Sequence, residues 1–254
     1  MDAVPLGLRH HGPVVELNLA RPPVNALNAS LLDALVGAIG AAVDEGAQAL
    51  VISGRPGLFS AGIDVRELLG TDRTGVAAYW QVFFATLRAI ASCPVPIGAA
   101  ITGHSPAGGA VLALFCDHRI MADGDFTIGL NEVRVGLPVP EVILAALRRQ
   151  VGPRNAEYLA VGGRMLTPQR ALEAGLVDRV VPADEVVPAS LEWARELIGL
   201  APQAMRVTRA NARADLIALF DSIGLDDAAL MAERWMSDET QQTMRAMIDK
   251  RGKP

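Results

Sequence analysis

The chain has 254 residues, of which 51% are hydrophobic, and carries a formal net charge of −5. This length suffices for one large α/β domain whose core needs no disulfide or metal. The acidic balance and the lack of a basic stripe with interleaved aromatic residues argue against nucleic acids and anionic membrane surfaces as partners. The two cysteines, Cys93 and Cys116, lie in apolar stretches and are expected to be buried free thiols.

The N-terminus runs directly into a strand-like segment at residues 14–19, without a basic region followed by an apolar one. Gly, Pro and charged residues interrupt the hydrophobic stretches before they reach membrane-spanning length. These features predict a soluble, cytoplasmic protein.

Apolar runs alternate with helical periodicity through the first two thirds of the chain. Strands are expected at 14–19, 50–53, 97–101, 118–121 and 177–181. Helices are expected at 31–43, 76–91, 110–115, 141–151 and 168–174. Strands separated by helices require crossover connections, so the pattern predicts an α/β fold whose sheet is at least partly parallel.

The strand pattern disappears after about residue 183. The rest of the chain has the periodicity of amphipathic helices, which we expect at 185–200, 203–219 and 226–250. We therefore divide the chain into a core, residues 1–183, and a C-terminal helical region, residues 184–254.

Two loops rich in small residues each connect a strand to a helix. The first is RPGLFSAGID at 55–64, and the second is GHSPAGGA at 103–110. Small residues let a ligand approach the backbone, and the helix start that follows leaves N–H groups unpaired. Two such donors aimed at one point would form an oxyanion hole. Either loop by itself is better explained as a tight turn between a strand and a helix.

A third segment, IGLNE at 128–132, follows another strand-like stretch. An isolated glutamate such as Glu132 is usually a solvated surface charge. The sequence has no HExxH, Walker, GxSxG or CxxC pattern, so metal chemistry and nucleotide-phosphate chemistry have no support.

Taken together and in this order, the three segments resemble the crotonase (enoyl-CoA hydratase/isomerase) superfamily. The resemblance extends from PPVNAL at 22–27 to AGLVD at 174–178, and includes CDHRI at 116–120 and LTPQRA at 166–171. It implies a crotonase-type spiral of ββα units that binds acyl-CoA, over residues 1–183. It also implies that residues 184–254 form a helical trimerisation region, so that the protein is a homotrimer or a hexamer made of two trimers.

The resemblance further implies roles for individual residues. The backbone N–H groups of Ile63 and Gly108 would form the oxyanion hole, and Glu132 would be the catalytic base and acid. Contacts with the substrate or its CoA part are implied for Ser60, Ala61, Gly62, Asp64 and Ala107. Asn131 would either orient Glu132 or satisfy a turn. No cofactor and no metal are implied, because coenzyme A is part of the substrate.

Val111 distinguishes between the reactions of the family. Hydratases carry two glutamates, one at the position of Val111 and one at the position of Glu132. Hydration needs this carboxylate pair, whereas moving a double bond needs one base that takes a proton from C2 and returns it to C4. The sequence therefore predicts an enoyl-CoA isomerase of acyl-CoA breakdown (β-oxidation), similar to the mitochondrial-type Δ3,Δ2-enoyl-CoA isomerases. The presence of Glu141 leaves open whether the site contains a second acid.

An apolar pocket around Glu132 would raise its pKa by desolvation, and the residues expected to line it are Ile63, Val111, Leu130 and Leu137. Other activities of the same family, such as hydratase, decarboxylase or thioesterase, remain alternatives. So does a protein that binds CoA thioesters without turnover. By charge alone, the candidates to bind the CoA phosphates are Arg21, Arg55, Lys250 and Arg251.

Overall fold

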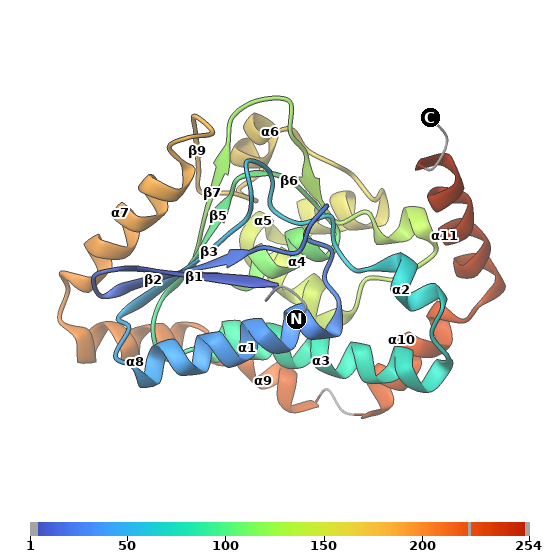
Figure 1. Ribbon diagram of the computed structural model, residues 1–254, viewed down its shortest axis with the longest axis horizontal. Coiled ribbons are helices and arrows are strands. Elements are labelled where there is room, and N and C mark those ends of the chain that lie inside the picture. Colours follow the sequence, from blue (N-terminus) through green and yellow to red (C-terminus); the bar gives the residue numbers. More distant parts are fainter. Residues whose placement is uncertain (1–4, 223–224, 252–254) are drawn as a thin grey trace.

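The computed structural model describes residues 5–222 and 225–251. Its centre is a six-stranded sheet in the order β1-β2-β3-β5-β7-β9 (Figure 1). The strands are β1 Leu6–His11, β2 Val14–Leu19, β3 Ala49–Ser53, β5 Ile97–Ile101, β7 His118–Ala122 and β9 Arg179–Val181. β1 is antiparallel to β2, and every later pair is parallel, which confirms the expected α/β fold with a partly parallel sheet.

A second, three-stranded sheet has the order β4-β6-β8, with parallel pairing throughout. Its strands are β4 Gly57–Leu58, β6 Gly103–Pro106 and β8 Ile128–Gly129. Each follows a strand of the large sheet within a few residues: β4 follows β3, β6 follows β5, and β8 follows β7. The chain therefore repeats a unit of one long strand, one short strand and a helical segment.

Helices surround both sheets. They are α1 Ala29–Asp44, α2 Val65–Leu69, α3 Arg73–Ser92, α4 Gly108–Phe115, α5 Glu141–Val161, α6 Pro168–Glu173, α7 Val186–Ile198, α8 Pro202–Ala212, α9 Ala214–Ser222, α10 Leu225–Trp235 and α11 Asp238–Arg251. A short 3-10 helix, η1 Glu132–Val135, lies between β8 and α5. Among the described residues, no helix has both the length and the hydrophobicity needed to cross a membrane.

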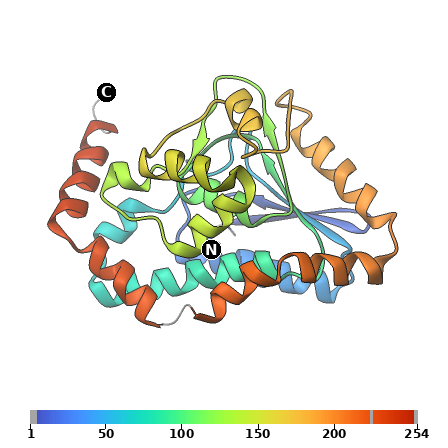
Figure 2. The ribbon, with the colours of Figure 1, turned by 180° about the vertical axis from the view of Figure 1, so that it is seen from behind.

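The large sheet has an apolar core on each face because side chains alternate along its strands. Leu50 and Ile52 of β3 belong to the larger core, with α1, α3 and α4. Val51 belongs to the smaller core, beneath α7. Figure 2 shows the helices around the large sheet from behind.

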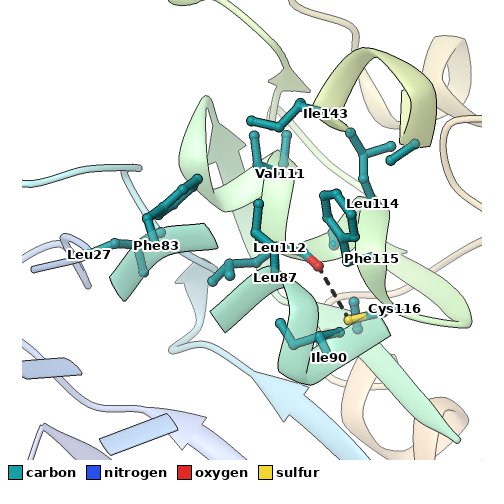
Figure 3. Packing of buried hydrophobic residues seen from close by; sticks show 14 of the residues in the cluster. Leu27, Phe83, Leu87, Ile90, Val111, Leu112, Leu114, Phe115, Cys116 and Ile143 are labelled. Atoms are coloured by element: carbon teal, nitrogen blue, oxygen red, sulfur yellow. Dashed lines mark hydrogen bonds between the residues drawn. The ribbon is translucent and has the colours of Figure 1, made fainter. Parts of the chain in front are cut away.

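Helices α3, α4 and α5 meet in the larger core. Figure 3 shows Leu87 and Ile90 of α3 beside α4, and Ile143 of α5 beside Val111. Cys116 lies in this cluster, and its Sγ donates to the carbonyl of Leu112 at 3.5 Å. Burial raises the pKa of the Cys116 thiol to about 12. Cys93 and Cys116 are both buried and free, as the sequence predicts.

The expected elements of the core match the structure to within a few residues. The helix expected at 141–151 is the first half of α5, which has non-helical backbone at Gly152. β1 was not expected. The expectation of single helices at 203–219 and 226–250 is wrong: the first divides into α8 and α9, and the second into α10 and α11.

The C-terminal helices pack closely on the rest of the chain. α7 lies against β3, β5 and β7, α10 against α3, and α11 against α2 and η1. The division into residues 1–183 and 184–254 stays a prediction about the sequence, and the two parts share extensive contacts.

A charged cluster fixes α8 to the core. Arg209 donates to Asp117 through Nε and Nη2, both at 2.9 Å, and Arg213 donates to Asp117 Oδ1 at 3.0 Å. Both arginines also donate to carbonyls at the ends of other helices: Arg209 to Cys93 and Arg213 to Phe115. The side chains of Arg209 and Asp117 are only 10% and 15% exposed, so water screens this cluster weakly.

Asp117→Ala should therefore lower the free energy of unfolding by about 3–5 kcal/mol, because it leaves two mostly buried guanidinium groups without their carboxylate. Urea denaturation followed by circular dichroism measures this. The control is Arg170→Ala, which breaks the pair with Glu173 at 73% and 61% exposure and should cost no more than about 1 kcal/mol. Equal effects of the two variants would contradict the stabilising role of Asp117.

Candidate active site

The small sheet brings the three predicted segments together. β4 pairs with β6 and β6 with β8, all in parallel, so the segments that follow them leave the sheet at one edge. The first loop follows β4, Ala107 and Gly108 follow β6, and Asn131 and Glu132 come shortly after β8. Ala107 N donates to Gly129 O at 2.9 Å, which fixes the second segment against the third.

The N–H groups of Ile63 and Gly108 are neighbours. A Cβ added to Gly108 would lie 3.2 Å from Ile63 N, and one added to Gly62 would lie 3.1 Å from Gly108 N. Neither N–H donates to an acceptor within the described part of the chain. The structure thus places two free donors side by side, as an oxyanion hole requires.

The backbone before Gly108 is held in an unusual conformation. Ala107 has φ 46° and ψ −121°, in a region that residues with a side chain rarely adopt. Such a conformation costs about 1–3 kcal/mol and persists only where the surroundings enforce it. α4 begins directly afterwards without a side-chain cap, so the helix start keeps its first N–H groups available.

Asn25 and Ser60 hold the first loop. Ser60 Oγ donates to Asn25 O at 2.7 Å and accepts from Gly62 N at 3.1 Å, while Asn25 Nδ2 donates to Phe59 O at 3.0 Å. Ser60 is fully buried. Its side chain supports the loop, and the expected contact with the CoA part of the substrate stays a prediction.

Asn25 was not among the predicted site residues. It has φ 49°, a left-handed conformation that Asn tolerates better than most residues. An asparagine in the PPVNAL segment was the available signal, but its partners in the first loop, Phe59 and Ser60, lie more than 30 residues away in the sequence.

Leu27 aligns the loop by backbone hydrogen bonds. Leu27 N donates to Gly62 O at 2.8 Å, and Asp64 N donates to Leu27 O at 3.1 Å. Tyr79 OH donates to the same carbonyl at 2.9 Å. Because Leu27 uses the carbonyl before Ile63 and the N–H after it, the N–H of Ile63 itself stays free.

A cleft of about 370 Å³ opens beside these donors. The predicted residues that line it are Ala61, Ile63, Asp64, Ala107 and Asn131, and α11 contributes Met244, Met247 and Ile248. Gly62, Gly108 and Glu132 are not among the residues that line it.

Polar side chains at the cleft are already partly paired. Asp64 accepts from Glu67 N at 3.1 Å, at the start of α2, and pairs with Arg21 at 2.7 Å. Arg21 lines the cleft, whereas Arg55 does not. The side chains of Lys250 and Arg251 lie outside the described residues.

Glu132 is the first residue of η1 and is 8% exposed. Its Oε2 has no hydrogen-bond partner among the described residues. Burial raises the pKa of Glu132 to about 7, against a smaller lowering by its own backbone N–H. A carboxyl with this pKa exchanges protons readily near neutral pH. Val111, Leu130 and Leu137, which were expected around it, are all buried.

Glu141 does not serve as a second buried acid. Its carboxylate is exposed and pairs with Arg148 at 2.6 Å. Glu16 is buried, but it lies in β2 and pairs with Arg9 and His11. Val111 is 1% exposed in α4. Within the described chain, Glu132 is therefore the buried carboxylate with a free oxygen.

The side chain of Asn131 makes no hydrogen bond with the described residues, and its carbonyl accepts from Arg134 N at 3.0 Å. The backbone of Asn131 thus forms the turn into η1, while its side chain stays at the cleft. Among the described residues, no group of three His, Cys, Asp or Glu is arranged to hold a metal ion.

Comparison with known proteins identifies this architecture. The family model for enoyl-CoA hydratase/isomerase matches residues 9–253. The chain belongs to the enoyl-CoA hydratase/isomerase family. In line with this membership, the chain is similar to a human protein, enoyl-CoA delta isomerase 1, mitochondrial, with 34% identity over 203 residues that cover 79% of this chain and 67% of that protein.

A rat protein of the same name is 36% identical over 176 residues, which cover 68% of this chain and 61% of that protein. The chain thus matches less than two thirds of the rat protein's length. The crystal structure of human mitochondrial delta3-delta2-enoyl-CoA isomerase superposes with a TM-score of 0.93 at 28% identity, over 97% of each chain. The predicted crotonase-type fold is confirmed.

Gly108→Val keeps the backbone N–H but should displace or cover it, and we expect kcat to fall at least as far as on loss of an oxyanion donor, about 10²–10³-fold. Its Cβ would lie 3.1 Å from Leu27 Cδ1 and 3.2 Å from Ile63 N, so the larger side chain closes the site. The control is Gly40→Val in α1, where no heavy atom lies within 4 Å of an added Cβ. Steady-state kinetics on 3-enoyl-CoA, with circular dichroism to confirm folding, measure the difference. Full activity of folded Gly108→Val would refute this role.

Proposed function

We propose that the protein is an enoyl-CoA isomerase that converts 3-enoyl-CoA to trans-2-enoyl-CoA. One observation carries the proposal: among the described residues, Glu132 is the buried carboxylate with a free oxygen, its neighbour Asn131 and the N–H donor Ile63 both line the cleft, and a buried valine, Val111, stands where a second carboxylate would be. The names of the human and rat relatives support the same reaction.

In the proposed mechanism, the thioester oxygen accepts hydrogen bonds from Ile63 N and Gly108 N. Glu132, as carboxylate, takes a proton from C2, and the electron pair of the C2–H bond spreads over C2, C4 and the thioester oxygen as a dienolate. The two N–H donors stabilise its negative charge, each by about 3–4 kcal/mol. Glu132, now a carboxylic acid, returns the proton to C4, which leaves the double bond between C2 and C3.

The environment of Glu132 suits both halves of this cycle. A carboxylate with an ordinary pKa is a weak base, and its acid form would be scarce near neutral pH. Burial brings the pKa to about 7, so that the same group both accepts and returns the proton. The steps use only protein groups and the substrate, of which coenzyme A is a part.

We also propose that the protein forms a homotrimer, or a hexamer of two trimers. Helix α8 has no buried residue, and an apolar groove of about 440 Å³ lies between it and the end of α7. Apolar surface of this kind supports an interface between copies. Sedimentation velocity would contradict the proposal if the protein stayed monomeric at micromolar concentration.

The reaction itself separates an isomerase from a hydratase. Purified protein should isomerise 3-hexenoyl-CoA at least about 10²-fold more efficiently than it hydrates crotonyl-CoA. Water addition lacks the second carboxylate, and help from one such group is typically worth about 10²–10⁴-fold. Spectrophotometric assays of kcat/KM on the two substrates measure this ratio. Hydration as efficient as isomerisation would refute the proposal and favour a hydratase.

Glu132→Gln should abolish isomerisation while acyl-CoA still binds, because the N–H donors remain. In the wild type, kcat/KM should rise with pH and reach half its maximum near pH 7, since the base must be deprotonated and its pKa is about 7. Kinetics across pH 5–9 and calorimetric titration with an acyl-CoA test both statements. Retained isomerase activity in Glu132→Gln would rule out the proton shuttle. If the wild-type protein binds acyl-CoA but has no activity, it is a binding protein without turnover.

A further inference from the structure

Helix α11 lies against the two elements that frame the candidate active site. It packs on α2, which follows the first loop, and on η1, which begins with Glu132 (Figure 1). Met244, Met247 and Ile248 of α11 also line the cleft. The C-terminal end of the chain therefore contributes to a site whose other parts lie between residues 21 and 135.

One buried hydrogen bond joins α11 to η1. Thr240 is fully buried, and its Oγ1 donates to Gly136 O at 2.7 Å. Gly136 ends η1 with φ 78°, and a Cβ added there would lie 3.0 Å from Thr240 Cα. The close approach of the two backbones thus depends on a glycine at this position. Ser237 Oγ donates to Thr240 Oγ1 at 3.0 Å, which leaves the threonine proton free for Gly136.

The peptide group that accepts the hydrogen bond from Thr240 is also bonded to the backbone of Glu132. The carbonyl of Gly136 and the N–H of Leu137 belong to one planar peptide unit. Leu137 N donates to the carbonyl of Glu132 at 3.1 Å. The hydroxyl of Thr240 is therefore linked to the backbone of Glu132 by two hydrogen bonds through one peptide plane, and bonds in such a chain strengthen one another.

We propose that Thr240 is a positioning residue, which fixes the backbone of Glu132 through the Gly136–Leu137 peptide and so makes α11 part of the active site. The inference rests on the proposed isomerase function. The free Oε2 of Glu132 supports it, because a carboxylate with an unpartnered oxygen must be aimed by its backbone and packing. A displacement of about 1 Å at such a group can cost about 10²-fold in rate.

Under this proposal, the packing of α11 on η1 also helps to keep Glu132 away from water. Desolvation is the largest cause of its raised pKa, and no other charged side chain contributes to the shift. If η1 separates from α11, water reaches the carboxyl and its pKa falls toward the ordinary value. Loss of the Thr240 hydroxyl should therefore change the pH dependence of the reaction as well as its rate.

The test compares Thr240→Val, which removes the hydroxyl at nearly constant size, with Thr240→Ser, which keeps it. The matched control is Thr243→Val, one turn further along α11, whose partly buried side chain has no hydrogen bond with the described residues. In Thr240→Val, kcat on 3-hexenoyl-CoA should fall at least about tenfold with KM within about twofold. The acid limb of its kcat/KM profile should move to lower pH. Thr240→Ser and Thr243→Val should resemble the wild type in kcat and in the pH profile of kcat/KM.

A folded Thr240→Val variant with wild-type kcat and pH profile overturns the inference, and the proposed function stands if Glu132→Gln is inactive. If Glu132→Gln is active, both fail. Lower thermal stability of Thr240→Val with an unchanged pH profile also overturns the inference, since it reveals a purely structural contact. Should Thr240→Val fail to fold, Thr240→Ala removes the same hydroxyl with a smaller side chain and is judged by the same measurements.

Discussion

Parallel hydrogen bonds between β4, β6 and β8 join three parts of the chain that are far apart in sequence. The strands are only two to four residues long, and they are too short to be stable without the large sheet and its cores. Their pairing sets the distance between the two loops to a few ångströms, and the N–H groups of Ile63 and Gly108 become neighbours as a result. The helix η1, which begins with Glu132, follows the third of these strands.

The site that results is costly to maintain. Ala107 occupies a rare backbone conformation, and two N–H groups and a buried carboxyl oxygen have no partner among the residues that the structure describes. Each of these features would destabilise an isolated loop. The apolar cores on both faces of the large sheet, with Asn25, Ser60 and Leu27 around the first loop, keep the arrangement in place. The unpaired groups are those that the proposed reaction uses.

Several polar contacts connect the C-terminal helices to the rest of the chain, and two of them are largely shielded from water. Arg209 and Arg213 bind Asp117 and the ends of α3 and α4, whereas Thr240 binds the end of η1. The first contact fixes α8 against the core, and the second brings α11 to the cleft. A region that the sequence suggests for oligomerisation thus also borders the site of the same chain.

The sequence by itself determined the α/β alternation and the two small-residue loops, which rest on local periodicity and on residue types. Glu132 and Val111, on which the proposed reaction depends, were singled out by the resemblance to a known family. Only the tertiary structure decided that β1 forms an edge strand, that Ser60 supports its loop, that the tail divides at Arg213 and Ser237, and that Asn25 and Thr240 matter. β1 pairs with the adjacent strand β2, whereas the hydrogen bonds of Asn25, Ser60 and Thr240 join residues 34 to 104 positions apart. A hydrogen bond across such a separation leaves no periodic signal in the chain, because it exists only once the backbone has brought donor and acceptor together.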